Sequence, residues 1–237
     1  MRAAVIAVLL SAVLAQHAAA YDAYDPANCN GAGDDKRALS VWKVTVHPRV
    51  NFVKSPYDDD FTASSCPAAT AACRKKNYLL TGDLVLVGEA RGEFSCVSYQ
   101  SPLAKKHVWA NGWLPTAALT PVAPMPSPKP ADWIGTWRHP GGHVSVKPGE
   151  GGKLNIEGEM VVATARDFHN GGFSAQVTPR ARPQEGASTL IFADDGSNYG
   201  DECRVRMQRI GPWLLVVDNA GCGGAGVSFL GLYRRGK

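Results

Sequence analysis

Apolar and polar residues alternate over short stretches of this chain, as they do in β-strands that bury one face. Residues 40–46 and 94–99 follow this pattern in the first half of the sequence. Residues 84–87, Leu-Val-Leu-Val, are apolar at every position, which indicates a strand buried on both faces. Pro48 ends the first of these strands, and residues 55–72 have the composition of a turn-rich loop.

The second half of the chain contains a longer series of short strand patterns. The predicted strands are residues 133–137, 143–147, 154–162, 173–177, 189–193, 203–210, 213–218 and 227–234. Turns such as Asn170-Gly171-Gly172 and Gly211-Pro212 supply the backbone conformations that hairpins need. Strands at this spacing predict an eight-stranded antiparallel meander or barrel, so the fold class that we expect is all-β.

A proline-rich stretch, residues 120–132, divides the chain. Its prolines lack backbone N–H donors and favour an extended conformation, so we expect a semi-rigid spacer outside any sheet interior. The predicted organisation is a signal peptide at residues 1–20, an N-terminal extension at 21–39, a first β domain at 40–119, the linker at 120–132 and a β-barrel domain at 133–237.

The first twenty residues have the features of a secretory signal peptide. Arg2 is followed by an almost unbroken apolar run and then by the small residues Ala18-Ala19-Ala20. The run is shorter than the roughly 20 apolar residues that span a bilayer, and no later stretch approaches that length. We therefore expect an exported protein, periplasmic or secreted, that does not span a membrane.

Six cysteines follow the signal, and an exported chain keeps disulfides. Nearness in the sequence favours two pairs, and elimination leaves a third that would tie the extension to the first domain, although the sequence alone does not fix the connectivity. The favoured pairs are Cys66–Cys73, Cys203–Cys222 and Cys29–Cys96. Zinc ligation is the rival interpretation, but the sequence has no C-x-x-C or C-x-x-H spacing to support it.

Several short motifs in the first half occur in an order that resembles a bacterial SH3-like domain. They are Gly82-Asp83 before Leu84-Val85-Leu86-Val87, then Cys96-Val97-Ser98-Tyr99, then Gly112-Trp113-Leu114-Pro115 with Leu119. The resemblance covers roughly residues 40–120 and implies a small barrel that binds peptides or cell-wall fragments through an aromatic groove. The sequence departs from the pattern in a cysteine-containing insertion, residues 55–76, which would cover or reshape that groove.

The start of the second domain, Trp133-Ile134-Gly135-Thr136-Trp137, is similar to the first strand of lipocalin-like or avidin-like barrels. Such a resemblance implies a closed barrel, in which Trp133 and Trp137 would plug the mouth and any ligand cavity would be small. The end of the chain is similar to the tails of small envelope proteins, and that similarity brings no activity with it.

Charge and motif content narrow the classes of function. The formal net charge is only +4, and the basic groups are short, which does not indicate a nucleic-acid-binding protein. No G-x-S-x-G sequence is present, and every cysteine is expected to be oxidised, so we expect no enzymatic activity and no cofactor. His139, His143 and His169 could together bind zinc, and the acidic loop from Asp194 to Glu202 could bind calcium. The simpler interpretation of both groups is that they are exposed turns.

Aromatic residues are the better binding candidates. Tyr57, Tyr99, Trp109 and Trp113 belong to the SH3-like segment, where they would form a platform for peptide or glycan. Trp113 also has the character of a core residue, because a small barrel needs large side chains to bury enough area. The sequence thus predicts an exported binding protein for peptidoglycan or an envelope protein. The alternatives are a periplasmic inhibitor of a wall-degrading enzyme such as lysozyme, facing it through the acidic loop, and a lipocalin-type carrier of a small molecule.

Overall fold

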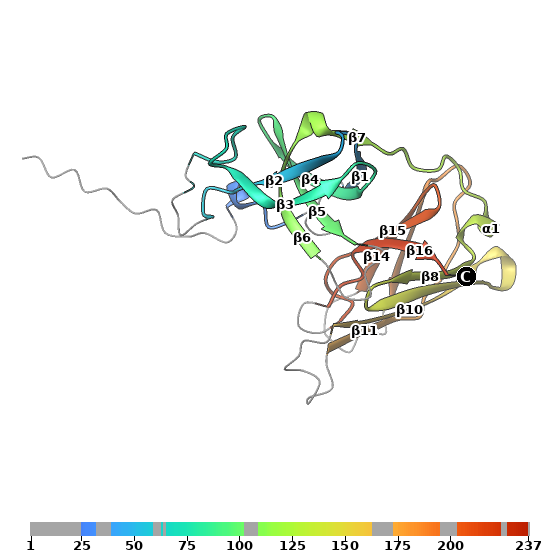
Figure 1. Cartoon of the computed structure of the whole chain (residues 1–237). Helices are drawn as coiled ribbons and strands as arrows, with labels where there is room; N and C mark the ends of the chain where they lie inside the picture. The colour runs from blue at the N-terminus through green and yellow to red at the C-terminus, as the bar shows by residue number, and fades with distance from the viewer. Residues whose placement is uncertain are drawn as a thin grey trace, which may run out of the picture.

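The computed structural model describes residues 25–31, 39–58, 63, 65–101, 109–162, 173–194, 203–223 and 227–236. The predicted signal peptide, His169 and most of the acidic loop lie outside these residues. Two curled antiparallel sheets make up the fold, so the expected all-β class is confirmed (Figure 1). We call residues 39–121 the first module and residues 130–236 the second module.

The first module is a seven-stranded sheet whose strands are not in sequence order. It contains β1 (Ser40–Val44), β2 (Arg49–Val53), β3 (Arg74–Leu80), β4 (Leu84–Arg91), β5 (Phe94–Gln100), β6 (Trp109–Pro115) and β7 (Leu119–Pro121), with a 3-10 turn at Thr116–Ala118. A second 3-10 turn, Pro26–Asn28, lies in the N-terminal extension. The order across the sheet is β3-β2-β6-β5-β4-β1-β7. One core, which includes Val44, Phe52, Val85, Val97 and Leu114, fills the inside of the curl.

Two details of the first module differ from the sequence expectation. Strand β2 was not anticipated, because it is short and begins directly after Pro48. Strand β7 occupies the first two residues of the predicted linker, and Pro121 pairs with Trp42 of β1. Proline is tolerated there because β7 is an edge strand, where a missing N–H leaves no ladder bond unmade.

The second module is an up-and-down meander. It contains a helical turn α1 (Pro130–Trp133), a 3-10 turn (Glu150–Gly152) and β8 (Gly135–His139), β9 (Gly142–Pro148), β10 (Leu154–Val162), β11 (Phe173–Val177), β12 (Arg180–Ala181), β13 (Thr189–Asp194), β14 (Cys203–Ile210), β15 (Trp213–Asp218) and β16 (Gly231–Arg235). The order β11-β10-β9-β8-β16-β15-β14-β13 joins the first and last strands of the meander and places its two open edges at β11 and β13. The last strand begins at Gly231, four residues later than the pattern predicted.

Large side chains fill the interior of the second module. Trp133, Trp137, Met160, Phe229 and Tyr233 are each no more than 1% exposed and belong to one continuous apolar core. The indole N–H of Trp137 donates to the Trp133 carbonyl at 2.9 Å, and the Tyr233 hydroxyl donates to the Phe229 carbonyl at 2.9 Å. The curled sheet therefore encloses a packed core.

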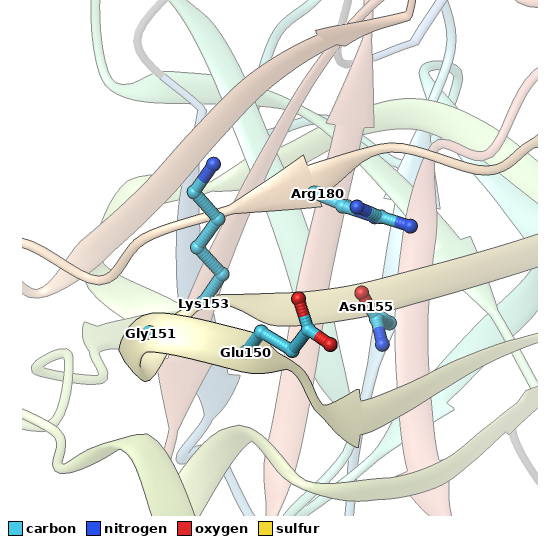
Figure 2. A pocket seen from close by; sticks show the side chains of 5 residues that line it. All are labelled: Glu150, Gly151, Lys153, Asn155 and Arg180. Atoms are coloured by element: carbon cyan, nitrogen blue, oxygen red, sulfur yellow. The ribbon is translucent and has the colours of Figure 1, made fainter.

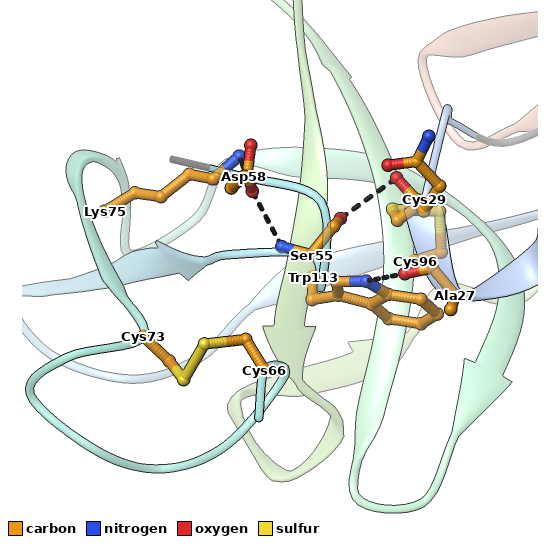
Figure 3. A network of polar contacts seen from close by, with 10 residues as sticks. Ala27, Cys29, Ser55, Asp58, Cys66, Cys73, Lys75, Cys96 and Trp113 are labelled. Atoms are coloured by element: carbon orange, nitrogen blue, oxygen red, sulfur yellow. Dashed lines mark hydrogen bonds and ion pairs between the residues drawn. A yellow bond between two sulfur atoms is a disulfide. The ribbon is translucent and has the colours of Figure 1, made fainter. Parts of the chain in front are cut away.

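Disulfides join the same three pairs of cysteines that the sequence favoured: Cys29–Cys96, Cys66–Cys73 and Cys203–Cys222. The first holds the N-terminal extension against the outer face of β5, where the indole N–H of Trp113 donates to the Ala27 carbonyl at 3.2 Å (Figure 3). Three disulfides indicate an oxidising environment outside the cytoplasm. Within the described residues, no helix has the length and apolar character needed to cross a membrane.

The two modules dock face to face. Leu39, Val41 and Leu86 of the first module form one buried apolar cluster with Ile210, Leu215, Val217 and Leu232 of the second. Figure 1 shows the red-orange strands β15 and β16 as the part of the second sheet nearest the first module. The linker follows this joint, since Val122 packs on the same cluster and the Met125 N–H donates to the Arg209 carbonyl at 2.8 Å.

Candidate functional site

A cleft opens at the joint between the two modules. Its volume is about 350 Å³, and it is lined by Gly82, Asp83, Leu84, Tyr99, Gln100, Trp213, Leu232 and Arg234. The first five come from the β3–β4 turn, the start of β4 and the end of β5, and the last three come from β15 and β16. Neither module forms the cleft alone, and boundaries between domains are common positions for ligand sites.

The cleft combines aromatic surfaces with charges of both signs. Tyr99 and Trp213 come from opposite modules, and the Arg234 guanidinium lies 5.5 Å from the centroid of the Trp213 ring. On the first module, one Asp83 carboxylate oxygen accepts the Leu80 N–H at 2.8 Å, which fixes the β3–β4 turn. Aromatic faces can pack on sugar rings or aliphatic chains, while Arg234 suits a carboxylate and Asp83 an ammonium group.

The environment of Tyr99 shows that this side of the cleft is partly shielded from water. Burial raises the pKa of the Tyr99 hydroxyl above its usual value. A hydrogen bond with Ser101 opposes the rise in pKa, and the neighbouring Asp83 carboxylate adds to it. The protonated hydroxyl is therefore favoured, and its hydrogen bond with Asp83 ties the two residues together on this side of the cleft.

A polar contact beside the cleft fixes the position of one module against the other. Gln100 reaches from the end of β5 into the second module, where its Oε1 lies 2.6 Å from Nε2 of His139. The His139 ring packs on the Tyr233 ring with a centroid separation of 4.8 Å. A methyl group at Gly231 would lie 2.5 Å from the Gln100 oxygen and 2.6 Å from His139 Nε2, so this position needs glycine for the close approach.

The four predicted contact residues do not form one platform. Tyr99 lines the cleft, and Trp109, which is 42% exposed, pairs with Gln100 in the β5–β6 ladder beside it. Trp113 is 1% exposed and belongs to the cluster around the disulfides, in keeping with its core character. Tyr57 is half-buried near the N-terminal extension, where its hydroxyl donates to the Asp25 carboxylate at 2.6 Å.

A second pocket, of about 360 Å³, lies beside the N-terminal extension. Asp25, Ala27, Glu89, Ala90, Arg91 and Trp113 line it. The hydrogen bond from Tyr57 is the main reason why the pKa of Asp25 is lowered, with smaller contributions from the Ala27 N–H and from Arg91. Its one aromatic lining residue, Trp113, is only 1% exposed, so this pocket is a poorer fit to a sugar or peptide than the cleft.

A third pocket, of about 390 Å³, lies at the turn between β9 and β10. Glu150, Gly151, Lys153, Asn155 and Arg180 line it. Figure 2 shows that the Lys153 side chain extends away from those of Glu150, Asn155 and Arg180. The charged groups do not converge on one point, and we do not assign a ligand to this pocket.

The described residues give no support to the zinc site or the calcium site. His139 is buried and in contact with Gln100, contrary to the expectation of an exposed turn, because the joint between the modules covers it. His143 is half-buried on β9, and His169 and residues 195–202 lie outside the described part. No group of three or more metal-ligating side chains is found in the part of the chain that the structure describes.

The three cleft residues of the second module, Trp213, Leu232 and Arg234, were not predicted from the sequence. Trp213 follows the predicted Gly211-Pro212 turn, and Arg234 belongs to the short basic pair Arg234-Arg235. One sequence feature could have indicated this contact: residues 214–217 are all apolar, like residues 84–87, so both faces of that strand are expected to be buried. Comparison of the chain with protein-family models, with curated protein sequences and with solved structures finds no significant match.

Proposed function

We propose that this chain is an exported binding protein without enzymatic activity, acting in the periplasm or outside the cell. Its ligand is envelope material, peptidoglycan or an envelope protein, of which a short glycan or peptide segment occupies the cleft between the modules. The observation that carries this proposal is the cleft itself, which places Tyr99 and Trp213 beside opposite charges at Asp83 and Arg234.

The chemistry of peptidoglycan fits this combination. Its sugar rings present flat apolar faces to aromatic side chains, and its peptide stems carry carboxylate and amino groups that suit Arg234 and Asp83. The SH3-like resemblance of the first module points to the same class of ligand. The cleft differs from the predicted groove because three of its eight lining residues belong to the second module.

No specific observation favours either alternative function, the small-molecule carrier or the inhibitor of a wall-degrading enzyme. The interior of the second module is filled by the core around Trp137, Phe229 and Tyr233, which gives no support to a small-molecule carrier. The acidic loop that would face lysozyme lies almost entirely outside the described residues.

The test is a pull-down of the mature protein, with its disulfides intact, on insoluble peptidoglycan and on envelope extract. We expect Trp213→Ala and Tyr99→Ala each to reduce retention about tenfold or more, as truncation of a central aromatic contact does. Tyr57→Phe, which changes a hydroxyl away from the cleft, is the matched control and should bind normally. Full retention of both cleft variants would refute the assignment of the site, and a wild-type protein that binds neither material would refute the function.

A further inference from the structure

The outer face of the first sheet is covered in two places and exposed in a third. The disulfide cluster with Val53, Cys96 and Trp113 covers the outer face at β5 and β6. The second module covers it at β1 and β4, through the cluster that contains Val41 and Leu86. The start of β2 and the end of β3 remain exposed.

This exposed part carries an unusual concentration of apolar side chains. The exposed large apolar residues of the described chain are Val46, Tyr78, Leu80, Trp109, Val161 and Ile191. The first three lie together: Tyr78 and Leu80 are two residues apart on β3, and the Thr81 hydroxyl donates to the Val46 carbonyl at 2.6 Å. Their exposed fractions are 40%, 46% and 53% for Val46, Tyr78 and Leu80. Clustered exposed apolar groups mark interaction surfaces.

The same two strands are strongly basic. Their sequences, Arg-Val-Asn-Phe-Val and Arg-Lys-Lys-Asn-Tyr-Leu-Leu, contain four cations and no carboxylate. Lys75 is engaged with Asp58 at 2.8 Å, while Arg49, Arg74 and Lys76 are exposed. The Arg49 guanidinium lies 4.6 Å from the centroid of the Tyr78 ring, so cation and apolar surface are presented together.

We propose that this β2–β3 face, comprising Val46, Arg49, Arg74, Lys76, Tyr78 and Leu80, docks the protein on an anionic lipid bilayer. Charge complementarity supports the assignment, because cations near a surface of anionic lipids are attracted to it. Tyrosine is favoured at the level of the lipid headgroups, and Leu80 and Val46 extend the apolar contact beside it. This docking is independent of the function proposed for the cleft.

The test is co-sedimentation of the mature protein with vesicles of phosphatidylcholine mixed with phosphatidylglycerol, and with vesicles of phosphatidylcholine alone. We expect binding to the anionic vesicles only, and weaker binding as salt is raised. Because each cation contributes about fivefold to affinity, Arg49→Glu with Lys76→Glu should weaken binding at least about 25-fold. Tyr78→Ser with Leu80→Ser should weaken it about tenfold.

The matched control is Lys153→Glu with Arg180→Glu, which makes the same change in net charge on exposed residues of the second module. It should lose little binding. Melting temperatures measured alongside verify that each variant is folded, since exposed side chains contribute little to stability. Equal binding to both kinds of vesicle, no binding to either, or an equal loss in the control variant would overturn the proposal. An acidic protein as the true partner would give the second of these results.

Discussion

The docking of the two modules makes a sharp prediction for Leu86. On β4, Val85 and Val87 point into the core of the first module, whereas Leu86 belongs to the cluster shared with the second module. Leu86 is 3% exposed, and the second module supplies the partners that cover it. Replacing Leu86 with alanine therefore measures how firmly the two modules are packed together.

Truncation of a buried leucine to alanine removes its transfer free energy and leaves a cavity, which together cost about 3 kcal/mol. With a urea dependence of about 2 kcal/mol per M, this loss lowers the unfolding midpoint by about 1.5 M. Leu80→Ala is the matched control, because it makes the same chemical change six residues away on a side chain that is 53% exposed. It should change the free energy of unfolding by less than about 0.5 kcal/mol.

The assay is urea unfolding at neutral pH with the disulfides intact, followed by circular dichroism and by tryptophan fluorescence. Docked modules should unfold together, so the two signals should share one transition in the wild-type protein. If Leu86→Ala were no more destabilising than Leu80→Ala, Leu86 would be facing solvent, and the cleft built on this joint would have no basis.

Three further predictions concern other elements of the fold. Replacing Cys29 and Cys96 by alanine opens a link between positions 67 residues apart and should cost about 4 kcal/mol in a urea unfolding experiment; a loss below about 1 kcal/mol would contradict the entropic argument. Gly231→Ala forces the new methyl group against Gln100 and should destabilise the protein by about 1–3 kcal/mol, a cost that an unchanged melting temperature would disprove. Burial raises the pKa of Tyr233 well above its usual value, so the folded protein holds that proton more tightly than the unfolded chain does. The contribution of protonated Tyr233 to the free energy of unfolding should be fully present below about pH 10 and be lost as the pH rises further. Urea midpoints measured from about pH 8 to about pH 11 should therefore fall less steeply in Tyr233→Phe than in the wild-type protein. An identical fall in the variant would show that another group is responsible.

Local patterns were sufficient for most of the second module. The bounds of β10, β11, β14 and β15 match the predicted strands, because each combines a strand pattern with a clear turn on at least one side. The cysteine pairs likewise follow from nearness in the sequence and elimination. Strand β2 escaped prediction because five residues after a proline carry too little periodicity to separate a strand from a loop.

Local sequence patterns do not predict which residues come together at the candidate site. Tyr99 was named because it belongs to the SH3-like segment, together with Tyr57 and Trp113. The structure places Tyr57 and Trp113 around the N-terminal extension and the disulfides, away from the cleft that Tyr99 lines. Trp213 and Arg234 join Tyr99 only because β15 and β16 pack against the outer face of β4. No property of their own segments marks them as neighbours of Tyr99.

Local sequence patterns were enough to predict the all-β class, most of the strands and the oxidised cysteines, because short-range alternation and turn residues encode these features. The tertiary structure decided which strand faces meet. The apolar runs at residues 84–87 and 214–217 each indicate a strand that is buried on both faces. Which part of the chain covers the second face of each strand depends on contacts between residues more than a hundred positions apart. The cleft exists only where those faces meet, so its lining was decided by packing between the modules.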